Sequence, residues 1–309
     1  MEKMANTVTA TVAREAGLVP DATRLGPVHI AVTEAERALS VWRDMVGLTV
    51  LARDDKGVTL GAGGKPLIVL EPGARRPVVP YTSGLYHVAI HVPTRKDLAV
   101  VIARLIASNF RNSPTDHLVT ETTYLWDLDG NGIEMTFETP WRGKLLTDGD
   151  RFGGVTSDGR PHSGREPVDL PSMLDELQRG EPLDVPLPAG TRIGHIHVHV
   201  ADLDDAMRFY SDVLGFQRQM LSRSFRMGDV TVDFPPHIIA WNTWAGEGAK
   251  QPPPDSAGLR WFTVNVPTAA ALAEMRSRLE AAGAPLTEID GGIETQDPSG
   301  NRMRIGVAG

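Results

Sequence analysis

Cysteine is absent from the 309 residues of the chain. Disulfide bonds and thiolate chemistry are therefore excluded, and any metal ion would have to be held by nitrogen and oxygen ligands. No segment approaches the roughly 20 consecutive apolar residues that a helix needs to span a membrane. Residues 1–24 also lack the basic start and apolar core of a signal peptide. We interpret them as an N-terminal arm and expect a cytoplasmic protein without a membrane partner.

Positive charge is also scarce. The chain carries 31 Lys and Arg against 39 Asp and Glu, which gives a formal net charge of −8. The basic residues are scattered rather than clustered, and this distribution argues against nucleic acid as a partner. The hydrophobic content of 41% over 309 residues is enough for more than one sizeable core. Two domains are therefore expected.

The sequence contains an internal repeat. The segment VHIAVTEAERALSVWRDMVGL at 28–48 aligns without a gap with IHVHVADLDDAMRFYSDVLGF at 196–216. A second pair consists of GLYHVAIHVP at 84–93 and GLRWFTVNVP at 258–267, each continuing to a closing strand. Four related modules result, which we number in chain order as 25–72, 83–140, 192–246 and 257–309.

Each module opens with a strand of alternating apolar residues, continues into a segment of helical period and closes with strands separated by Gly, Asp and Asn turns. The order is βαβββ, which predicts an α+β fold. We expect a first domain at 25–140, a second domain at 191–309 and a linker between them at 141–190. The linker is rich in Gly, Pro and charge and contains one short helical stretch, PSMLDELQRG.

Histidines line one face of two opening strands. In LYHVAIHV the apolar residues share the face that a helix would cover, while His87 and His91 share the opposite face. In GHIHVHV three histidines are separated from the apolar residues in the same way, and the closing strand IEMTFE bears Glu134 opposite its apolar face. A single histidine on such a face is ordinarily exposed to solvent. Five histidines and a carboxylate on equivalent faces favour a site.

The paired modules, the HxxV opening strand, the FYSDVLGF helix end and the DLDGNGIE closing strand resemble the vicinal oxygen chelate superfamily of glyoxalases, bleomycin resistance proteins and extradiol dioxygenases. The resemblance extends over nearly the whole chain. Within the superfamily, GLYHVAIHVP, DHLVTETTYLWDLDGNGIE, GHIHVHV and HIIAWNTW are similar to two-domain, catechol 2,3-dioxygenase-like ring-cleaving proteins. The resemblance implies two cupped β-sheet barrels with helices outside, in which two modules curl around one metal ion.

The resemblance also implies a mononuclear Fe(II) site with two His and one Glu as protein ligands, and Mn(II) or another divalent metal is the alternative. The family's ligand positions fall on His87 and Glu134 in the second module and on His195 in the third. The first module has Pro27, and the fourth has Trp261, where an opening-strand histidine should be. Only the second and third modules together supply the full set. We therefore predict that these two modules pair, within one chain or across a dimer.

Three further residues match the family's catalytic positions: His117, Tyr124 and His237. The resemblance implies that the two histidines exchange protons near neutral pH and that the tyrosine donates a hydrogen bond. The alternatives are a turn residue for His117 and a packed residue for His237. The pattern assigns no role to the remaining histidines on the opening strands, which are His29, His91, His197 and His199.

The function implied by the resemblance is extradiol cleavage of a catechol or hydroquinone-like ring with O2. A homodimer is expected because dimers are common in similar proteins. A single carboxylate among the ligands favours ring cleavage over a glyoxalase-type isomerase or lyase, whose site has two His and two Glu. A metal-free protein that binds a small aromatic compound is the third possibility. The sequence leaves the exact substrate and the native metal open.

Overall fold

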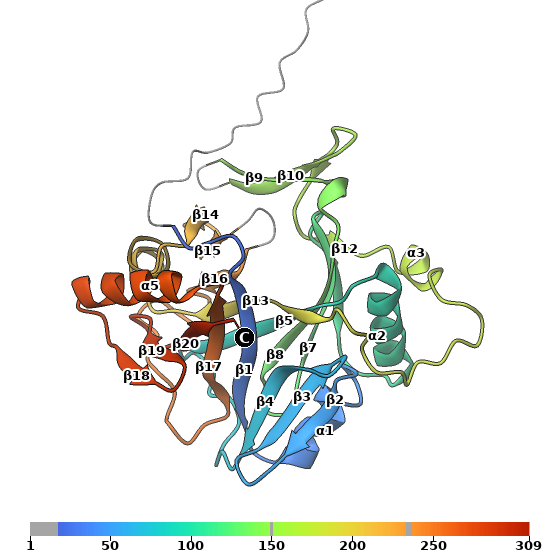
Figure 1. Cartoon of the computed structure of the whole chain (residues 1–309). Helices are drawn as coiled ribbons and strands as arrows, with labels where there is room; N and C mark the ends of the chain where they lie inside the picture. The colour runs from blue at the N-terminus through green and yellow to red at the C-terminus, as the bar shows by residue number, and fades with distance from the viewer. Residues whose placement is uncertain (1–17, 149–150, 233–236, 309) are drawn as a thin grey trace, which may run out of the picture.

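The computed structural model describes residues 18–148, 151–232 and 237–308. Of the predicted N-terminal arm, residues 1–17 lie outside the described residues. Two large β-sheets pack against each other at their central strands, and the helices lie on the outside (Figure 1). The predicted α+β class is confirmed. In the described part of the chain, no helix is long and apolar enough to cross a membrane.

Each large sheet is made of two modules, and the larger sheet also includes β12 (Glu166–Pro167) from the segment at 141–190. The nine-stranded sheet joins the second and third modules in the order β12, β6 (Ser113–Asp116), β7 (Thr120–Trp126), β8 (Gly132–Glu138), β5 (Gly84–His91), β13 (Arg192–His199), β16 (Ile239–Asn242), β15 (Met227–Thr231) and β14 (Gln217–Ser222). The eight-stranded sheet joins the fourth and first modules in the order β18 (Thr287–Ile289), β19 (Gly292–Gln296), β20 (Arg302–Val307), β17 (Gly258–Val266), β1 (Arg24–Val32), β4 (Lys65–Pro72), β3 (Val58–Ala62) and β2 (Thr49–Arg53). Within every module the strand order is first, fourth, third, second, and the first and fourth strands are parallel.

A helix follows the first strand of each module. These helices are α1 (Ala35–Trp42), α2 (Arg95–Ala107), α4 (Leu203–Met207), which continues into a π-helical turn at Arg208–Val213, and α5 (Ala269–Ala281). The helix α2 begins at a capping box, in which the Thr94 hydroxyl accepts from the Asp97 N–H and the Asp97 carboxylate accepts from the Thr94 N–H. Its buried side chains include Leu98, Val101 and Leu105. This apolar face packs into the core and leaves the opposite sheet face to polar residues.

The central strands of the nine-stranded sheet are β5 and β13. They pair antiparallel, with Ile196 opposite Val88 and His197 opposite His87. This register confirms the predicted pairing of the second module with the third, and the pairing occurs within one chain. In the eight-stranded sheet, β1 and β17 are central and antiparallel in the same way. Each half of the sequence therefore contributes one module to each sheet.

The segment at 141–190 contains more regular structure than the one short helix expected. After a 3-10 turn at Pro140–Arg142, the strands β9 (Gly143–Asp148), β10 (Arg151–Thr156) and β11 (Pro161–His162) form a three-stranded sheet, at the top of Figure 1. The strand β12 then pairs with β6, and the short helix α3 (Leu170–Leu174) follows. Short strands interrupted by glycine have too little apolar alternation to be recognised from the sequence.

Candidate metal centre

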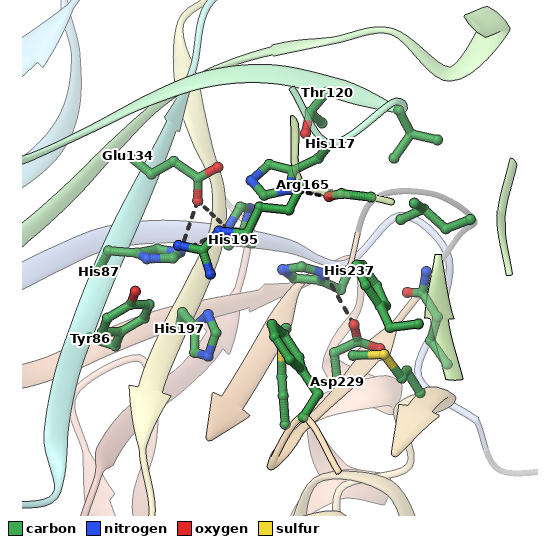
Figure 2. Close-up of a pocket in the computed structure, with 18 of the residues that line it drawn as sticks. Tyr86, His87, His117, Thr120, Glu134, Arg165, His195, His197, Asp229 and His237 are labelled. Atoms are coloured by element: carbon green, nitrogen blue, oxygen red, sulfur yellow. Dashed lines mark hydrogen bonds and ion pairs between the residues drawn. The ribbon is translucent and has the colours of Figure 1, made fainter. Parts of the chain in front are cut away.

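Three side chains meet at one point on the polar face of the nine-stranded sheet (Figure 2). The Nε2 atoms of His87 and His195 lie 2.9 Å and 3.0 Å from Glu134 Oε2, and 3.2 Å from each other. All three residues are buried. The structure thus brings together the three predicted ligand residues, although His87 and His195 are 108 positions apart in the sequence.

The backbone register explains this convergence. Ala89 of β5 pairs with His195 of β13 on one side and with Glu134 of β8 on the other. These three residues form a row across the sheet, and their side chains project from one face. His87 lies two positions before Ala89 and projects from the same face. The small, fully buried Ala89 side chain leaves the space in which the three donor atoms meet.

The protonation states of these residues suit metal binding. Burial lowers the pKa of His195 well below its ordinary value, which keeps this imidazole neutral near pH 7. Burial alone would raise the pKa of Glu134, but the adjacent His195 and His87 outweigh it and hold that pKa well below its usual range. Neutral imidazoles and ionised carboxylates are the forms that bind metal ions. Donor atoms so close together repel one another unless a proton or a metal ion lies between them.

The donor set fits a divalent metal ion. Three ligand atoms on one face of an octahedral ion, about 2.1 Å from the metal, would be about 3.0 Å apart. The observed separations are 2.9, 3.0 and 3.2 Å. Two imidazole nitrogens and one carboxylate oxygen are also suitable donors for first-row divalent metals. Among the described residues, His87, Glu134 and His195 are the one group of this kind whose donor atoms converge.

The predicted catalytic residues His117 and Tyr124 lie beside this centre. His117 occupies the turn between β6 and β7, and its Nδ1–H donates to the Gly164 carbonyl at 2.7 Å. Its Nε2 therefore accepts the hydrogen bond of the Tyr124 hydroxyl at 2.9 Å. Burial lowers the pKa of His117 and raises the pKa of Tyr124 well above 10.0. At neutral pH, His117 is a neutral acceptor and Tyr124 is a hydrogen-bond donor.

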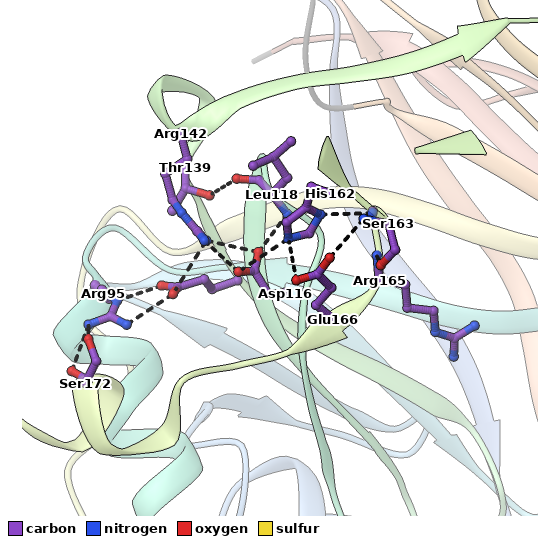
Figure 3. A network of polar contacts seen from close by, with 12 residues as sticks. Arg95, Asp116, Leu118, Thr139, Arg142, His162, Ser163, Arg165, Glu166 and Ser172 are labelled. Carbon is purple, nitrogen blue, oxygen red and sulfur yellow. Dashed lines mark hydrogen bonds and ion pairs between the residues drawn. The ribbon is translucent and has the colours of Figure 1, made fainter. Parts of the chain in front are cut away.

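An ion-pair network holds the turn that carries His117 (Figure 3). The Arg142 guanidinium donates two hydrogen bonds to the Asp116 carboxylate, at 3.0 Å and 2.6 Å. The same carboxylate accepts from the Leu118 N–H at 2.7 Å. Leu118 has a φ of 71°, a left-handed conformation that is unfavourable for a leucine unless its surroundings hold it. These contacts fix the residues on both sides of His117.

The predicted catalytic residue His237 lies just before β16. Its ring packs edge-on against the His195 ring, with centroids 4.4 Å apart, and its Nδ1 lies 3.3 Å from Asp229 Oδ2 on β15 (Figure 2). The Nε2 atom of His237 is buried and has no hydrogen-bond partner among the described residues. Asp229, which the sequence analysis missed, thus orients the ring and leaves Nε2 available to a bound molecule.

The segment at 141–190 supplies further residues that the sequence analysis did not foresee. The side chains of Leu145, Phe152 and Arg165 line the same pocket as the three predicted ligands. Within the described residues, Arg165 is the one Arg or Lys of this lining, and its side chain extends into the pocket (Figure 2). These residues reach the centre only because the three-stranded sheet and β12 bring the linker back beside it.

The walls of the pocket are mainly apolar. Aliphatic, thioether and aromatic side chains from several strands and loops form them: Val119, Leu145, Phe152, Met220, Phe225, Met227 and Trp244. Such walls, interrupted by a few polar groups, suit a flat aromatic molecule more than a strongly polar one.

The histidines without an assigned role occupy different environments. Asn242 joins His197 and His199, because its Nδ2 donates to His197 Nε2 at 2.8 Å and its Oδ1 accepts from His199 Nδ1–H at 2.7 Å. Burial lowers the pKa of both histidines. His197 lines the pocket, whereas His91 and His29 are not part of its lining.

Comparisons with known proteins agree with this architecture. The family model described as "Glyoxalase/Bleomycin resistance protein/Dioxygenase superfamily" matches residues 24–135 and 192–305. A catechol-2,3-dioxygenase of Bacillus subtilis (strain 168) is 35% identical over 279 residues, which cover 89% of this chain and 94% of that protein.

Two solved structures share the fold. A candidate dioxygenase of Bacillus subtilis subsp. subtilis strain 168 has a TM-score of 0.58 at 14% identity, covering 92% of this chain and 84% of that one. Glyoxalase I of Zea mays has a TM-score of 0.52 at 12% identity, covering 92% of each chain. Because their sequence identities to this chain are so low, these two structures are evidence for the fold alone. The family model and the 35% identical relative show more: the chain belongs to the glyoxalase/bleomycin resistance protein/dioxygenase superfamily and, within it, to the catechol-2,3-dioxygenase-like proteins.

Proposed function

We propose that this protein is an extradiol dioxygenase that inserts O2 into a catechol or hydroquinone-like ring. His87, Glu134 and His195 hold its metal ion, and a small aromatic diol and O2 are its substrates. The observation that carries the proposal is the convergence of two imidazole nitrogens and one carboxylate oxygen, each within 3.2 Å of the others. The 35% identity to a catechol-2,3-dioxygenase supports the same class of reaction.

The donor set favours Fe(II), with Mn(II) as the alternative. Two neutral imidazoles and one carboxylate on one face of an octahedral ion leave three positions open, which is the arrangement of non-haem iron sites that activate oxygen. When held by His87, Glu134 and His195, the iron would supply Lewis-acid and redox chemistry for the reaction of the diol with O2.

The third module argues against a glyoxalase-type isomerase, which would require a second glutamate. In the second module, Glu134 of β8 pairs with Ala89 of β5. At the equivalent place in the third module, Ala240 of β16 pairs with His197 of β13. Ala240 therefore occupies the position of the second carboxylate and offers no ligand atom.

Two histidines exchange protons with the substrate, and a tyrosine donates a hydrogen bond to it. His237 accepts a proton from a diol hydroxyl, since Asp229 holds its Nδ1 and its Nε2 is free of any hydrogen bond within the described residues. The Tyr124 hydroxyl stays protonated because burial raises its pKa, so it turns its hydrogen from His117 to a substrate oxygen that gains negative charge. His117, which is neutral, accepts a proton at its Nε2 and later returns that same proton to the substrate.

The test uses the full chain, purified without oxygen and reconstituted with Fe(II). A panel of catechols and hydroquinones is offered with O2, and metal content, O2 uptake and product absorbance are measured. We expect one iron per chain, one O2 consumed per diol and a ring-fission product that absorbs visible light. Glu134→Gln is the matched control, because it keeps the size of the side chain and removes its negative charge.

Two outcomes would contradict the proposal. A chain that binds iron but consumes no O2 with any diol would be an isomerase or lyase with the same ligands. A chain that binds no metal under these conditions would be a protein that sequesters an aromatic compound. Light scattering on the same preparation tests the predicted homodimer, and the location in the cytoplasm stays a prediction.

A further inference from the structure

A chain of hydrogen bonds runs from the back of the His195 ring to the protein surface. His195 Nδ1, on the side of the ring away from Glu134, lies 3.2 Å from His91 Nε2. His91 Nδ1 lies 2.6 Å from Glu138 Oε1, and the Arg192 guanidinium donates to the same oxygen. Both imidazoles are buried, Glu138 is half-buried and Arg192 is exposed.

The carboxylate at the end of this chain sets the direction of every bond. Burial alone would raise the pKa of Glu138, but its bonds to His91 and Arg192 outweigh that effect and lower its pKa to about 2. An ionised carboxylate only accepts hydrogen bonds, so His91 Nδ1 carries the hydrogen and His91 Nε2 has a lone pair. His195 Nδ1–H must then donate to that lone pair. The remaining nitrogen, His195 Nε2, then carries no hydrogen and directs its lone pair toward the point where the three donor atoms meet.

A glycine in β13 leaves room for the His91 ring. A Cβ atom on Gly194, the residue before His195, would lie 2.0 Å from Cδ2 of the His91 imidazole. Any side chain at position 194 would therefore displace His91 from the hydrogen bond to His195. Gly194 allows the ring to lie close against the backbone of β13, where it reaches the back of His195.

Comparison of equivalent positions in the two large sheets shows which part of this arrangement is specific to the nine-stranded sheet. The positions of His195, His91 and Glu138 correspond in the eight-stranded sheet to Pro27, Asn265 and Ala308. Gly194 corresponds to Gly26, and a Cβ on Gly26 would lie 2.6 Å from Asn265 Nδ2. Close packing of a polar side chain against a glycine is thus common to both sheets. Among the described residues of the two large sheets, the His–His–carboxylate chain occurs only in the sheet with the three converging donors.

We propose that His91, oriented by Glu138, is a positioning residue that holds His195 in the tautomer and ring orientation required for its Nε2 to bind the metal ion. This inference rests on the proposed function of His195 as a ligand. Carboxylate or carbonyl groups behind a ligand histidine have this effect in general, and removing them weakens metal affinity about 10- to 100-fold. Here a second imidazole stands between the ligand and the carboxylate.

His87 lacks such support. Its Nδ1 is buried and has no hydrogen-bond partner among the described residues. The two histidines are therefore held differently. His195 is preset by the chain behind it, whereas His87 is held by ring contacts with Tyr124 and His197 and by Glu134 at its Nε2.

The experiment compares three variants of the full chain by Co(II) binding, measured anaerobically by calorimetry and by the visible absorbance of the bound ion. His91→Asn retains a donor toward Glu138 but is too short to reach His195. His91→Gln places an acceptor near the position of the imidazole Nε2. Asn265→Ala removes the corresponding side chain from the eight-stranded sheet. We expect about 10- to 100-fold weaker binding for His91→Asn, recovery of most of this loss in His91→Gln, and wild-type affinity in Asn265→Ala.

Thermal unfolding of the metal-free proteins accompanies these measurements. If His91→Asn does not fold, Glu138→Gln replaces it, because this substitution leaves the His91 ring in place and is expected to weaken Co(II) binding in the same direction. Wild-type affinity in a folded His91→Asn or Glu138→Gln variant would overturn the inference, and so would equal losses in His91→Asn and His91→Gln. Absence of Co(II) binding by the wild-type chain would instead overturn the proposed function, so the two failures are distinguishable.

Discussion

The two large sheets have the same strand order, but their centres are filled differently. In the nine-stranded sheet, the polar faces of β5, β8 and β13 bring three donor atoms to within 3.2 Å of one another. The positions of His87, Glu134 and His195 correspond in the eight-stranded sheet to Trp261, Arg304 and Pro27. The nine-stranded sheet thus offers three donor atoms to a cation, whereas the eight-stranded sheet contains the positively charged side chain of Arg304.

Stacked rings and paired charges occupy the centre of the eight-stranded sheet. Trp261 stacks on His29 with ring centroids 4.0 Å apart, and the Arg304 guanidinium lies 3.6 Å from the centre of the Trp261 ring. Arg304 also donates to Glu294 at 2.7 Å, and His29 Nδ1 lies 3.1 Å from Glu71. The positive charge of Arg304 is therefore neutralised within the sheet.

The same strand order forms around the stacked side chains of the eight-stranded sheet, so the fold itself does not need a metal ion. The stack around Trp261 contributes favourable contacts by itself, on the order of 1 kcal/mol for the cation–π pair. Without a metal ion, the three converging donor atoms can share only a proton, whereas a bound metal ion would satisfy all three. Burying two imidazoles and a carboxylate away from water is unfavourable, so these side chains point to a functional site rather than to a role in folding.

Removing a ligand residue is expected to have the largest effect. His87→Ala and Glu134→Ala should each lower metal content from one ion per chain to none and ring cleavage by more than about a thousandfold, because the ion loses one of its three protein donors. Elemental analysis and product absorbance measure the two effects. Both variants should stay folded, since these side chains lie off the helix-covered face. Unfolding of both, seen by circular dichroism, would mean that the residues are structural.

Matched substitutions in the eight-stranded sheet serve as the controls. Trp261→His and Arg304→Ala should each leave one metal ion per chain and ring cleavage unchanged. The loss of the cation–π contact in Arg304→Ala should cost only about 1 kcal/mol of stability. Two metal ions in the wild-type chain, or loss of the ion on changing Arg304, would contradict the assignment of the metal ion to the nine-stranded sheet alone.

Changes beside the donors should have an intermediate effect, on rate and not on metal content. His117→Ala should reduce kcat by about 100- to 10,000-fold and Tyr124→Phe by about 100-fold, because each removes a group that exchanges or donates a hydrogen. Burial lowers the pKa of His117, so the acid limb of the rate profile that depends on it lies below about pH 6.5 and is absent in His117→Ala. Steady-state kinetics across pH test both expectations. Loss of metal in either variant would assign the residue to the structure of the site instead.

A difference in pH-dependent stability concerns Glu138, whose place in the eight-stranded sheet is taken by Ala308. The pKa of Glu138 is lowered to about 2 in the folded protein, since its bonds to His91 and Arg192 outweigh burial. Its charge therefore stabilises the fold above the ordinary glutamate pKa of about 4.5, and this stabilisation is lost as pH falls from about 4.5 to about 2.

Urea unfolding of the metal-free wild type and Glu138→Gln measures this contribution. The variant should be less stable at pH 6, on the order of 2 kcal/mol. This difference in the free energy of unfolding should disappear toward pH 2. In proteins that also carry Arg192→Ala, the difference made by Glu138→Gln should be smaller at pH 6. A gap of constant size from pH 6 to pH 2 would contradict the assigned ion pair.

Much of the candidate site was accessible from the sequence, because its pattern is local and repeated. Alternation along the opening strands predicted which face bears His87 and His195, and the internal repeat showed that Trp261 and Pro27 stand at the equivalent places in the other modules. The ligand set that the family resemblance implied was complete only in the second and third modules, and the structure confirms that these two pair. Metal binding by these residues stays a prediction.

Other residues could not be found in this way, because their role depends on contacts between distant segments. Asp229 orients His237 only through the register of β15 with β16. Arg165 comes from a linker whose short, glycine-interrupted strands have no recognisable periodicity. His91 had the same pattern as any other histidine on its face until its distances to His195 and Glu138 were known.

Strand alternation and helical periodicity are properties of a few consecutive residues, so the four modules, their βαβββ order and the face on which each histidine lies could be predicted from the sequence. Contacts between distant strands decided how three donors from β5, β8 and β13 share one point and which groups stand behind them. That decision rests on strand register, and a shift of one residue would turn every side chain of a strand to the other face.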